Sequence, residues 1–140
     1  MGLSEIGCIA YQNWEAISEH FDHVILDEFI VMPNHVHGLI GIKNWPNKNQ
    51  SVDARHVMHL PGNEHQPFKN EFGPLKPGSL SVIIGAYKSS ITRWTHKNNI
   101  DFEWQSRFHD HIVRNEKSLN RIRNYIYSNP LKWEGDRYYR

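Results

Sequence analysis

The sequence has little of several features that would assign it to a familiar class of protein. It has one cysteine, Cys8, which excludes an internal disulfide framework and a zinc site built from cysteines. It has no signal peptide and no apolar run approaching the roughly 18 residues of a membrane span, so we expect a soluble, cytoplasmic protein. The formal net charge is only +1, so any nucleic-acid binding must rest on local basic patches. No internal repeat and no nucleotide-binding loop is visible.

The bulk composition is that of an ordinary globular domain. The 140 residues are 39% hydrophobic and 22% charged, which suits one folded domain rather than a disordered chain. One segment differs, because Lys43 to Pro77 is dominated by Asn, Pro, Gly, Lys and His without a sustained period. We therefore expect a single domain, 1–140, that carries a mobile surface loop at about 43–77.

The first part of the chain predicts a helix followed by a β-hairpin. Apolar residues recur at helical spacing from Leu3 to Phe21. His23 to Val31 is rich in Val, Ile and Phe, as strands are, and His35 to Ile42 is a second apolar run. Between the two runs, Pro33 and Asn34 favour a tight turn.

The rest of the chain predicts a helix, a strand and a last helix. Leu80 to Asn98 shows a helical apolar period, with Ser79 as a candidate N-cap. Arg107 to Arg114 fits a strand, and Ser118 to Ser128 fits the last helix. Pro130 ends that helix because proline lacks an N–H and disfavours a helical predecessor.

A histidine pair, His35 and His37, flanks Val36 at the start of the second predicted strand. Alternate side chains of a strand share a face, so the imidazoles should stand side by side while Val36 packs on the other face. Two imidazoles at this spacing can share one divalent ion.

The last predicted helix offers a tyrosine and an amide to such an ion. Tyr125 and Asn129 are four residues apart and share a helical face. Tyr127 lies about 200° around the helix from Tyr125, so only one of the two tyrosines can face the histidines. Tyrosine is a competent covalent nucleophile once a metal or base activates it. The set is plausible for phosphoryl transfer, and Tyr125 is the preferred nucleophile.

Three stretches carry a resemblance to a known family. They are Asp27 to Ile42 (DEFIVMPNHVHGLIGI), Gly78 to Arg93 (GSLSVIIGAYKSSITR) and Trp104 to Trp133 (WQSRFHDHIVRNEKSLNRIRNYIYSNPLKW). With MPNHVH, WQ and YIxxNPLK in this order, the chain resembles the REP-associated tyrosine transposases. These are relatives of the single-tyrosine insertion-sequence transposases in the HUH endonuclease superfamily. The resemblance covers most of the chain outside Lys43 to Pro77.

The resemblance implies an α+β fold, a ferredoxin-like sandwich with an antiparallel sheet and helices on one face. Members of the family usually carry a further strand before the first helix, in the middle of the sheet. Only seven residues precede Cys8 here, and none fits that strand. We therefore expect a sheet that lacks its first strand.

The resemblance also implies a reaction. Tyr125 attacks single-stranded DNA, leaving a 5′-phosphotyrosine and a free 3′-hydroxyl. His35, His37 and Asn129 hold one Mg²⁺ or Mn²⁺, and the imidazoles favour Mn²⁺ because Mg²⁺ prefers oxygen ligands. The expected substrate is hairpin DNA from repetitive extragenic elements, and the protein is expected to act as a monomer or homodimer.

Several basic residues are candidates for contact with the DNA backbone. They would act together with the aromatic residues Tyr87, Trp94 and Trp104, which could stack unpaired bases. The basic set comprises Lys88, Arg93, Lys97, Arg107, Arg114, Arg121 and Arg123.

Other readings stay open. The chain could be a DNA-binding remnant of a transposase that cuts nothing. It could also be a metal-dependent hydrolase that activates water, with Asp27 or Glu28 as the nearby base. Other histidines have the right chemistry but weaker context, namely the competing pair His109 and His111 and the loop residues His56, His59 and His65.

Overall fold

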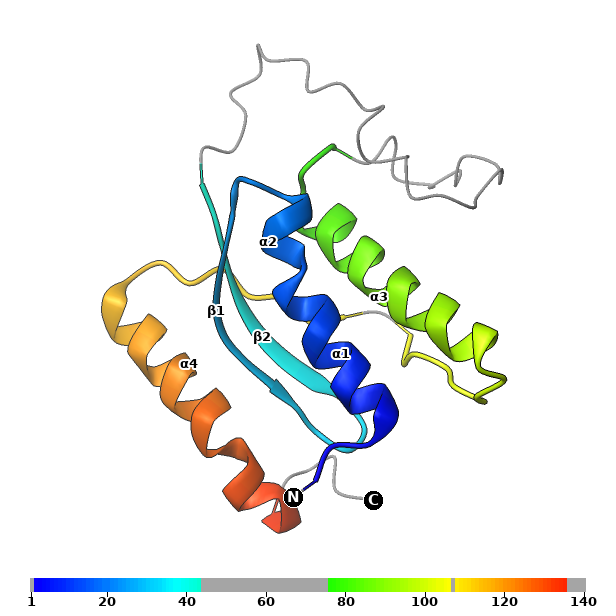
Figure 1. Cartoon of the computed structure of the whole chain (residues 1–140). Helices are drawn as coiled ribbons and strands as arrows, with labels where there is room; N and C mark the ends of the chain where they lie inside the picture. The colour runs from blue at the N-terminus through cyan, green and yellow to red at the C-terminus, as the bar shows by residue number, and fades with distance from the viewer. Residues whose placement is uncertain (1, 44–75, 107, 136–140) are drawn as a thin grey trace.

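The computed structural model describes residues 2–43, 76–106 and 108–135 (Figure 1). The mixture of helices with an antiparallel strand pair confirms the predicted α+β class. The elements in chain order are α1 (Glu5–Glu15), α2 (Ile17–His20), β1 (Val24–Val31), β2 (Val36–Ile42), α3 (Leu80–Lys97), α4 (Glu116–Ser128) and the 3-10 helix η2 (Asn129–Gly135). In this part of the chain no helix is long and apolar enough to cross a membrane.

The first predicted helix is present but is divided at Ala16. Ser4 caps α1, since its hydroxyl accepts a hydrogen bond from the backbone N–H of Gly7. Near the division, the Ser18 hydroxyl donates to the carbonyl of Glu15 at 3.2 Å. This side-chain bond offers the Glu15 carbonyl a partner outside the regular helical pattern. The apolar face predicted for this region is buried on both sides of the division.

The predicted β-hairpin is confirmed. β1 and β2 pair antiparallel from Val24 opposite Ile42 to Val31 opposite Val36. The register shifts between Leu26 and Phe29, where the consecutive residues Asp27 and Glu28 stand opposite a single residue of β2. A bulge of this kind inserts one extra residue and so keeps the apolar residues before and after it on the same face.

The core lies between the hairpin and the layer formed by α1 and α3. Trp14 stacks on Phe29 with ring centroids 4.3 Å apart, and it closes over the backbone of Gly38, where an added Cβ would lie 2.2 Å from the indole. The Tyr87 hydroxyl donates to the carbonyl of Ala10 at 3.2 Å. Burial raises the pKa of the Tyr87 phenol far above its ordinary value. The prediction that Tyr87 stacks DNA bases is therefore wrong, because this ring is part of the core.

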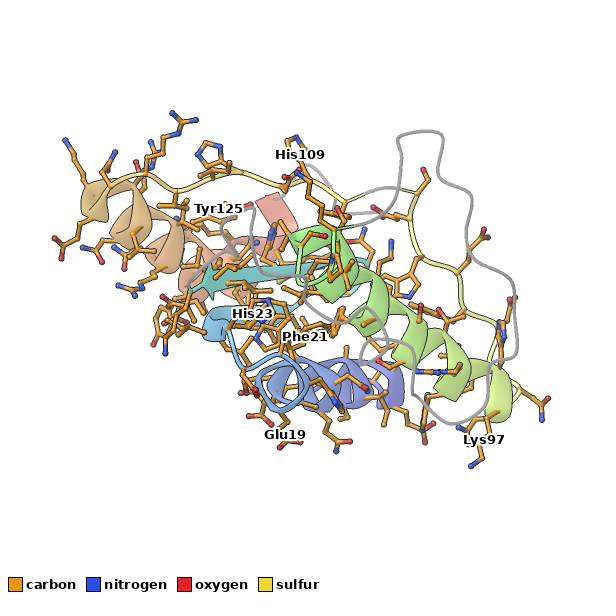
Figure 2. All side chains as sticks on the ribbon, turned by 90° about the horizontal axis from the view of Figure 1, so that it is seen from above. Glu19, Phe21, His23, Lys97, His109 and Tyr125 are labelled. Carbon is orange, nitrogen blue, oxygen red and sulfur yellow. The ribbon has the colours of Figure 1, made fainter. Side chains whose placement is uncertain are left out.

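α4 covers the other face of the hairpin. Val36 packs against the core cluster and Gly38 lies under Trp14, so His37 between them points away from α1. There its ring meets Tyr125 of α4 at 5.3 Å between centroids. Figure 2 shows Tyr125 and Phe21 on opposite sides of the strands. The prediction that all helices lie on one face is wrong for α4, because both faces of this short sheet carry apolar residues that need cover.

The predicted strand at Arg107 to Arg114 is not found. Arg107 lies outside the described residues, and residues 108–114 form an extended segment without strand pairing. The only sheet that the described residues form is two-stranded, β1 with β2. An apolar alternation predicts a strand only if a neighbouring strand is available to pair with it. Here Ile112 is 71% exposed, which shows that this alternation covers no core.

Side-chain caps fix where α3 and α4 begin. The last helix begins at Glu116 rather than Ser118, because the Asn115 side chain caps it by accepting from the backbone N–H of Ser118 at 2.8 Å. Ser79 caps α3 as predicted. Most of the predicted loop at 43–77 lies outside the described residues.

Candidate active site

The two histidines meet at the turn end of the hairpin. His35 precedes the first residue of β2 and His37 is its second residue. The backbone N–H of Met32 donates to the carbonyl of His35 at 2.8 Å and closes the turn. The Nε2 atoms of His35 and His37 lie 2.9 Å apart, with the ring planes at 83°. Strand alternation thus brings the two imidazoles together on the face that α4 covers.

Asn34 orients the first histidine of the pair. Its side-chain oxygen lies 2.7 Å from Nδ1 of His35. In the tautomer that lets this amide oxygen accept a hydrogen bond, Nδ1 carries the proton and the lone pair of His35 is on Nε2, the atom that contacts His37. Metal-binding histidines are held in this way by a partner on the nitrogen that does not bind the ion.

The separation of the two nitrogens suits one shared metal ion. With metal–nitrogen bonds of about 2.1 Å, two ligands at a right angle stand about 3.0 Å apart, as in octahedral coordination. The observed 2.9 Å matches that spacing, and without an ion it is a hydrogen bond in which one Nε2 donates to the other. In the described part of the chain no three His, Cys, Asp or Glu side chains gather around a point. Among the described residues, a third protein ligand would therefore be of another type, such as an amide oxygen.

Asn129 is such an amide, and it is buried. Only 3% of the residue is exposed, and its Nδ2 has no hydrogen-bond partner among the described residues. Its backbone keeps helical angles at the end of α4, so it remains on the face of Tyr125 one turn later. A buried amide donor without a partner is unfavourable. A bound phosphate oxygen would satisfy this donor, while the amide oxygen is the atom suited to a metal.

Aromatic rings flank the histidine pair on both sides. The Tyr125 ring packs edge-on to His37, and Tyr125 is half exposed. Tyr127 is 77% exposed. On the other side, the Trp133 ring lies 5.9 Å from that of His35. Sequence reasoning missed Trp133 because Pro130 ended the predicted helix. The chain in fact continues as η2 and returns to the site.

An ion pair joins α4 to the bulge of β1. The guanidinium of Arg123 binds the carboxylate of Asp27, with Nε 3.0 and 3.1 Å from the two carboxylate oxygens and Nη2 on one of them. The hydrogen bonds from Arg123 hold the pKa of Asp27 below its ordinary value. Asp27 therefore stays ionised and already has a cationic partner, which makes it a poor general base. Of the two carboxylates named for a hydrolase, Glu28 is then the better candidate for the base.

The other predicted DNA contacts that the structure describes lie on α3, on α4 and on the segment before α4. Arg93, Lys97, Arg114 and Arg121 are exposed. Lys88 is partly buried, with its Nζ over the Trp104 ring at 5.2 Å from the centroid. Figure 2 shows Lys97 at the far end of α3 from Tyr125, so it does not belong to the site. His109 and His111 are exposed on the extended segment. Arg107, His56, His59 and His65 lie outside the described residues.

The comparison with known proteins gives one close relative. Over 144 residues the chain is 34% identical to an uncharacterized protein of Haemophilus influenzae, an alignment that covers 99% of this chain and 72% of the relative. The chain belongs to the family of this Haemophilus influenzae protein. No family model matches the chain, and no solved structure matches it. The relative's description states no activity, so family membership alone supports no particular reaction.

Proposed function

We propose that the protein is a metal-dependent single-stranded DNA endonuclease and strand transferase of the REP-associated tyrosine transposase type. The observation that carries the proposal is the contact of Tyr125 with His37, whose Nε2 converges with that of His35. The histidine pair lies, through His37, against a half-exposed tyrosine, and the helix of that tyrosine ends in a buried amide whose Nδ2 has no hydrogen-bond partner among the described residues. A phosphoryl-transfer site uses all of these groups.

The proposed ligands are His35, His37 and the side-chain oxygen of Asn129. A bound Mn²⁺ or Mg²⁺ would polarise the scissile phosphate and offset the charge of the transition state. Two nitrogen ligands favour Mn²⁺ over Mg²⁺. The Nδ2 of Asn129 would donate a hydrogen bond to an oxygen of the same phosphate.

Tyr125 is the proposed nucleophile. Its phenol oxygen forms a bond to phosphorus while the bond from phosphorus to the 3′ oxygen breaks. The phenol proton is lost to solvent, and the leaving oxygen gains a proton to become the free 3′-hydroxyl. The product is a 5′-phosphotyrosine, which conserves the phosphodiester energy so that a later 3′-hydroxyl can reseal the strand. The half-exposed position of Tyr125 leaves its ring accessible to DNA.

The proposed substrate is hairpin DNA with a single-stranded flank, bound in the cytoplasm by a monomer or homodimer. Arg114 and Arg121 are exposed near and on α4, which is the side of the hairpin that carries the site. Lys97, by contrast, lies at the far end of α3 from Tyr125 (Figure 2). We also propose that the α+β arrangement is a variant of the ferredoxin-like sandwich.

The experiment that tests this function is the capture of a covalent adduct. Labelled hairpin DNA is incubated with the protein and Mn²⁺, denatured, and run on a gel. We expect an adduct that Tyr125→Phe and His35→Ala both abolish. Tyr127→Phe is the matched control, since it removes the same hydroxyl from the same helix at an exposed position, and it should retain the adduct.

A DNA-binding protein without cleavage activity is the second candidate. The observation that favours it is the two-stranded sheet of the described residues, which is smaller than the resemblance implies. If the wild-type protein binds hairpin DNA but forms no covalent adduct with it, this candidate is established. Cleavage that persists in Tyr125→Phe would instead indicate a hydrolase that uses water.

A further inference from the structure

The ion pair between Asp27 and Arg123 joins two parts of the chain that carry different halves of the proposed site. Asp27 lies on the strand that pairs with the histidine strand, and Arg123 lies two residues before Tyr125. The guanidinium contacts both carboxylate oxygens, through Nε and Nη2. A contact of this kind fixes orientation as well as distance, because the planar fork of arginine must align with the carboxylate.

The helical positions of α4 show what this contact constrains. Successive residues are about 100° apart around a helix. Ile122 and buried Ile126 lie on the side toward the sheet. Arg123 is on one flank of that apolar stripe and Tyr125 on the other. Asp27 of β1 holds one flank, and His37 of β2 meets the other.

The β-bulge gives Asp27 its place. Because two residues of β1 stand opposite one residue of β2, the chain can direct the Asp27 carboxylate toward α4 while Leu26 and Phe29 both pack on the core side. The backbone N–H of Glu28 donates to the same carboxylate at 2.9 Å and fixes it further. The carboxylate is thus held on the strand before the arginine engages it.

We propose that Asp27 and Arg123 are positioning residues that set the rotation of α4 about its axis, and so aim Tyr125 and Asn129 at the histidine pair. This inference rests on the proposed function for its effect on catalysis. It reassigns Arg123, which the sequence suggested as a DNA contact. The two roles predict opposite behaviour for Asp27→Asn, because a DNA-binding arginine released from its carboxylate would bind DNA more tightly.

The kinetic test uses Asp27→Asn and Arg123→Gln, with Lys117→Gln as a control that removes a positive charge from the same helix. At saturating hairpin DNA, both test variants should form the adduct about 10- to 100-fold more slowly than the wild type, since small misplacements of reacting groups have effects of this size. Their DNA affinities should change far less, and Lys117→Gln should behave as the wild type. Two results would overturn the proposal: weaker DNA binding in Arg123→Gln with a normal rate at saturation, or a normal rate in Asp27→Asn.

A second measurement is independent of activity. Cys8 is the single cysteine and is exposed, so a spin label there and one at Tyr127→Cys report the placement of α4 relative to α1. Double electron–electron resonance should give a narrow distance distribution, which Asp27→Asn and Arg123→Gln broaden or shift while Lys117→Gln does not. Unchanged distances would contradict the positioning role. If the wild type forms no adduct, the proposed function fails, and the distance measurement still decides whether the pair positions the helix.

Discussion

At the level of single residues, Asn34 determines how His35 presents its nitrogens. With the amide oxygen accepting at 2.7 Å, Nδ1 is the donor and Nε2, which contacts Nε2 of His37, is the nitrogen that would bind an ion. Without this acceptor the imidazole can adopt the other tautomer or rotate, and both changes reduce its use as a ligand.

We expect Asn34→Ala to weaken Mn²⁺ binding by about 10- to 100-fold, which is typical for loss of a residue that orients a ligand. Asn34→Asp keeps an oxygen acceptor and should stay close to the wild type. Electron paramagnetic resonance of free Mn²⁺ gives the affinities directly. Circular dichroism of each variant checks that the hairpin turn is intact. Equal affinities in all three proteins would refute this role for Asn34.

At the level of elements, the approach of α1 to β2 depends on the absence of a side chain at Gly38. The six-membered ring of Trp14 occupies the space that a Cβ would need, and the same indole stacks on Phe29. Neither Trp14 nor Phe29 can move freely, because both rings are part of the packed core.

Gly38→Ala should therefore destabilise the protein by about 1–3 kcal/mol, as overpacking of a core does. Gly85→Ala is the matched control. No atom lies within 4 Å of the Cβ it would add on α3, and the better helix propensity of alanine should stabilise by up to about 1 kcal/mol. Urea unfolding of the three proteins measures both effects. A Gly38→Ala protein as stable as the wild type would show that Trp14 can move aside.

The contact between α4 and β1 also has a pH signature. The pKa of Asp27 is lowered from 3.8 in the folded protein, chiefly by its hydrogen bonds with Arg123. A lowered carboxyl pKa contributes stability above the unfolded-state pKa, and that contribution is lost as pH falls through the folded-state pKa. The stability of the wild type should thus exceed that of Asp27→Asn at neutral pH, by a small amount because the pair is partly exposed.

Thermal unfolding of both proteins between neutral pH and about pH 3 tests this linkage. The difference in stability should be constant near neutrality and should narrow below pH 4. Added salt at neutral pH should also reduce it. A difference that does not depend on pH would mean that the carboxylate charge has no part in holding α4.

At the level of the whole molecule, the sequence predicted the parts that depend on local patterns. The hairpin around Pro33 and Asn34 and the cap at Ser79 follow from spacing and turn chemistry, whereas the class of fold came from the family resemblance. Helical spacing predicts that only one of Tyr125 and Tyr127 faces the histidines, and the choice of Tyr125, which contacts His37, came from Asn129 one turn later and from the family resemblance. Each of these local features depends on residues that are close together in the chain, so they can be predicted from a single sequence.

The parts that failed depend on neighbours that are distant in sequence. Arg107 to Arg114 was predicted as a strand, yet no strand pairs with its described residues. Tyr87 looked available for DNA, but its hydroxyl binds Ala10, 77 residues away. The partner of Arg123, Asp27, is 96 residues away and was likewise not predicted. A buried or paired side chain has the same local sequence as a free one, so only the tertiary structure separates them.

The distance along the chain between Asp27 and Arg123 has a consequence for biosynthesis. Contacts 96 residues apart close a long loop and tend to form after local structure. The ribosome synthesises the β-hairpin before α4, so a growing chain carries both histidines while Tyr125 has not yet been made. On the proposed function, a nascent or prematurely terminated polypeptide that contains the histidine hairpin cannot nick DNA. Cutting ability would arise only when the last helix has been synthesised and has docked.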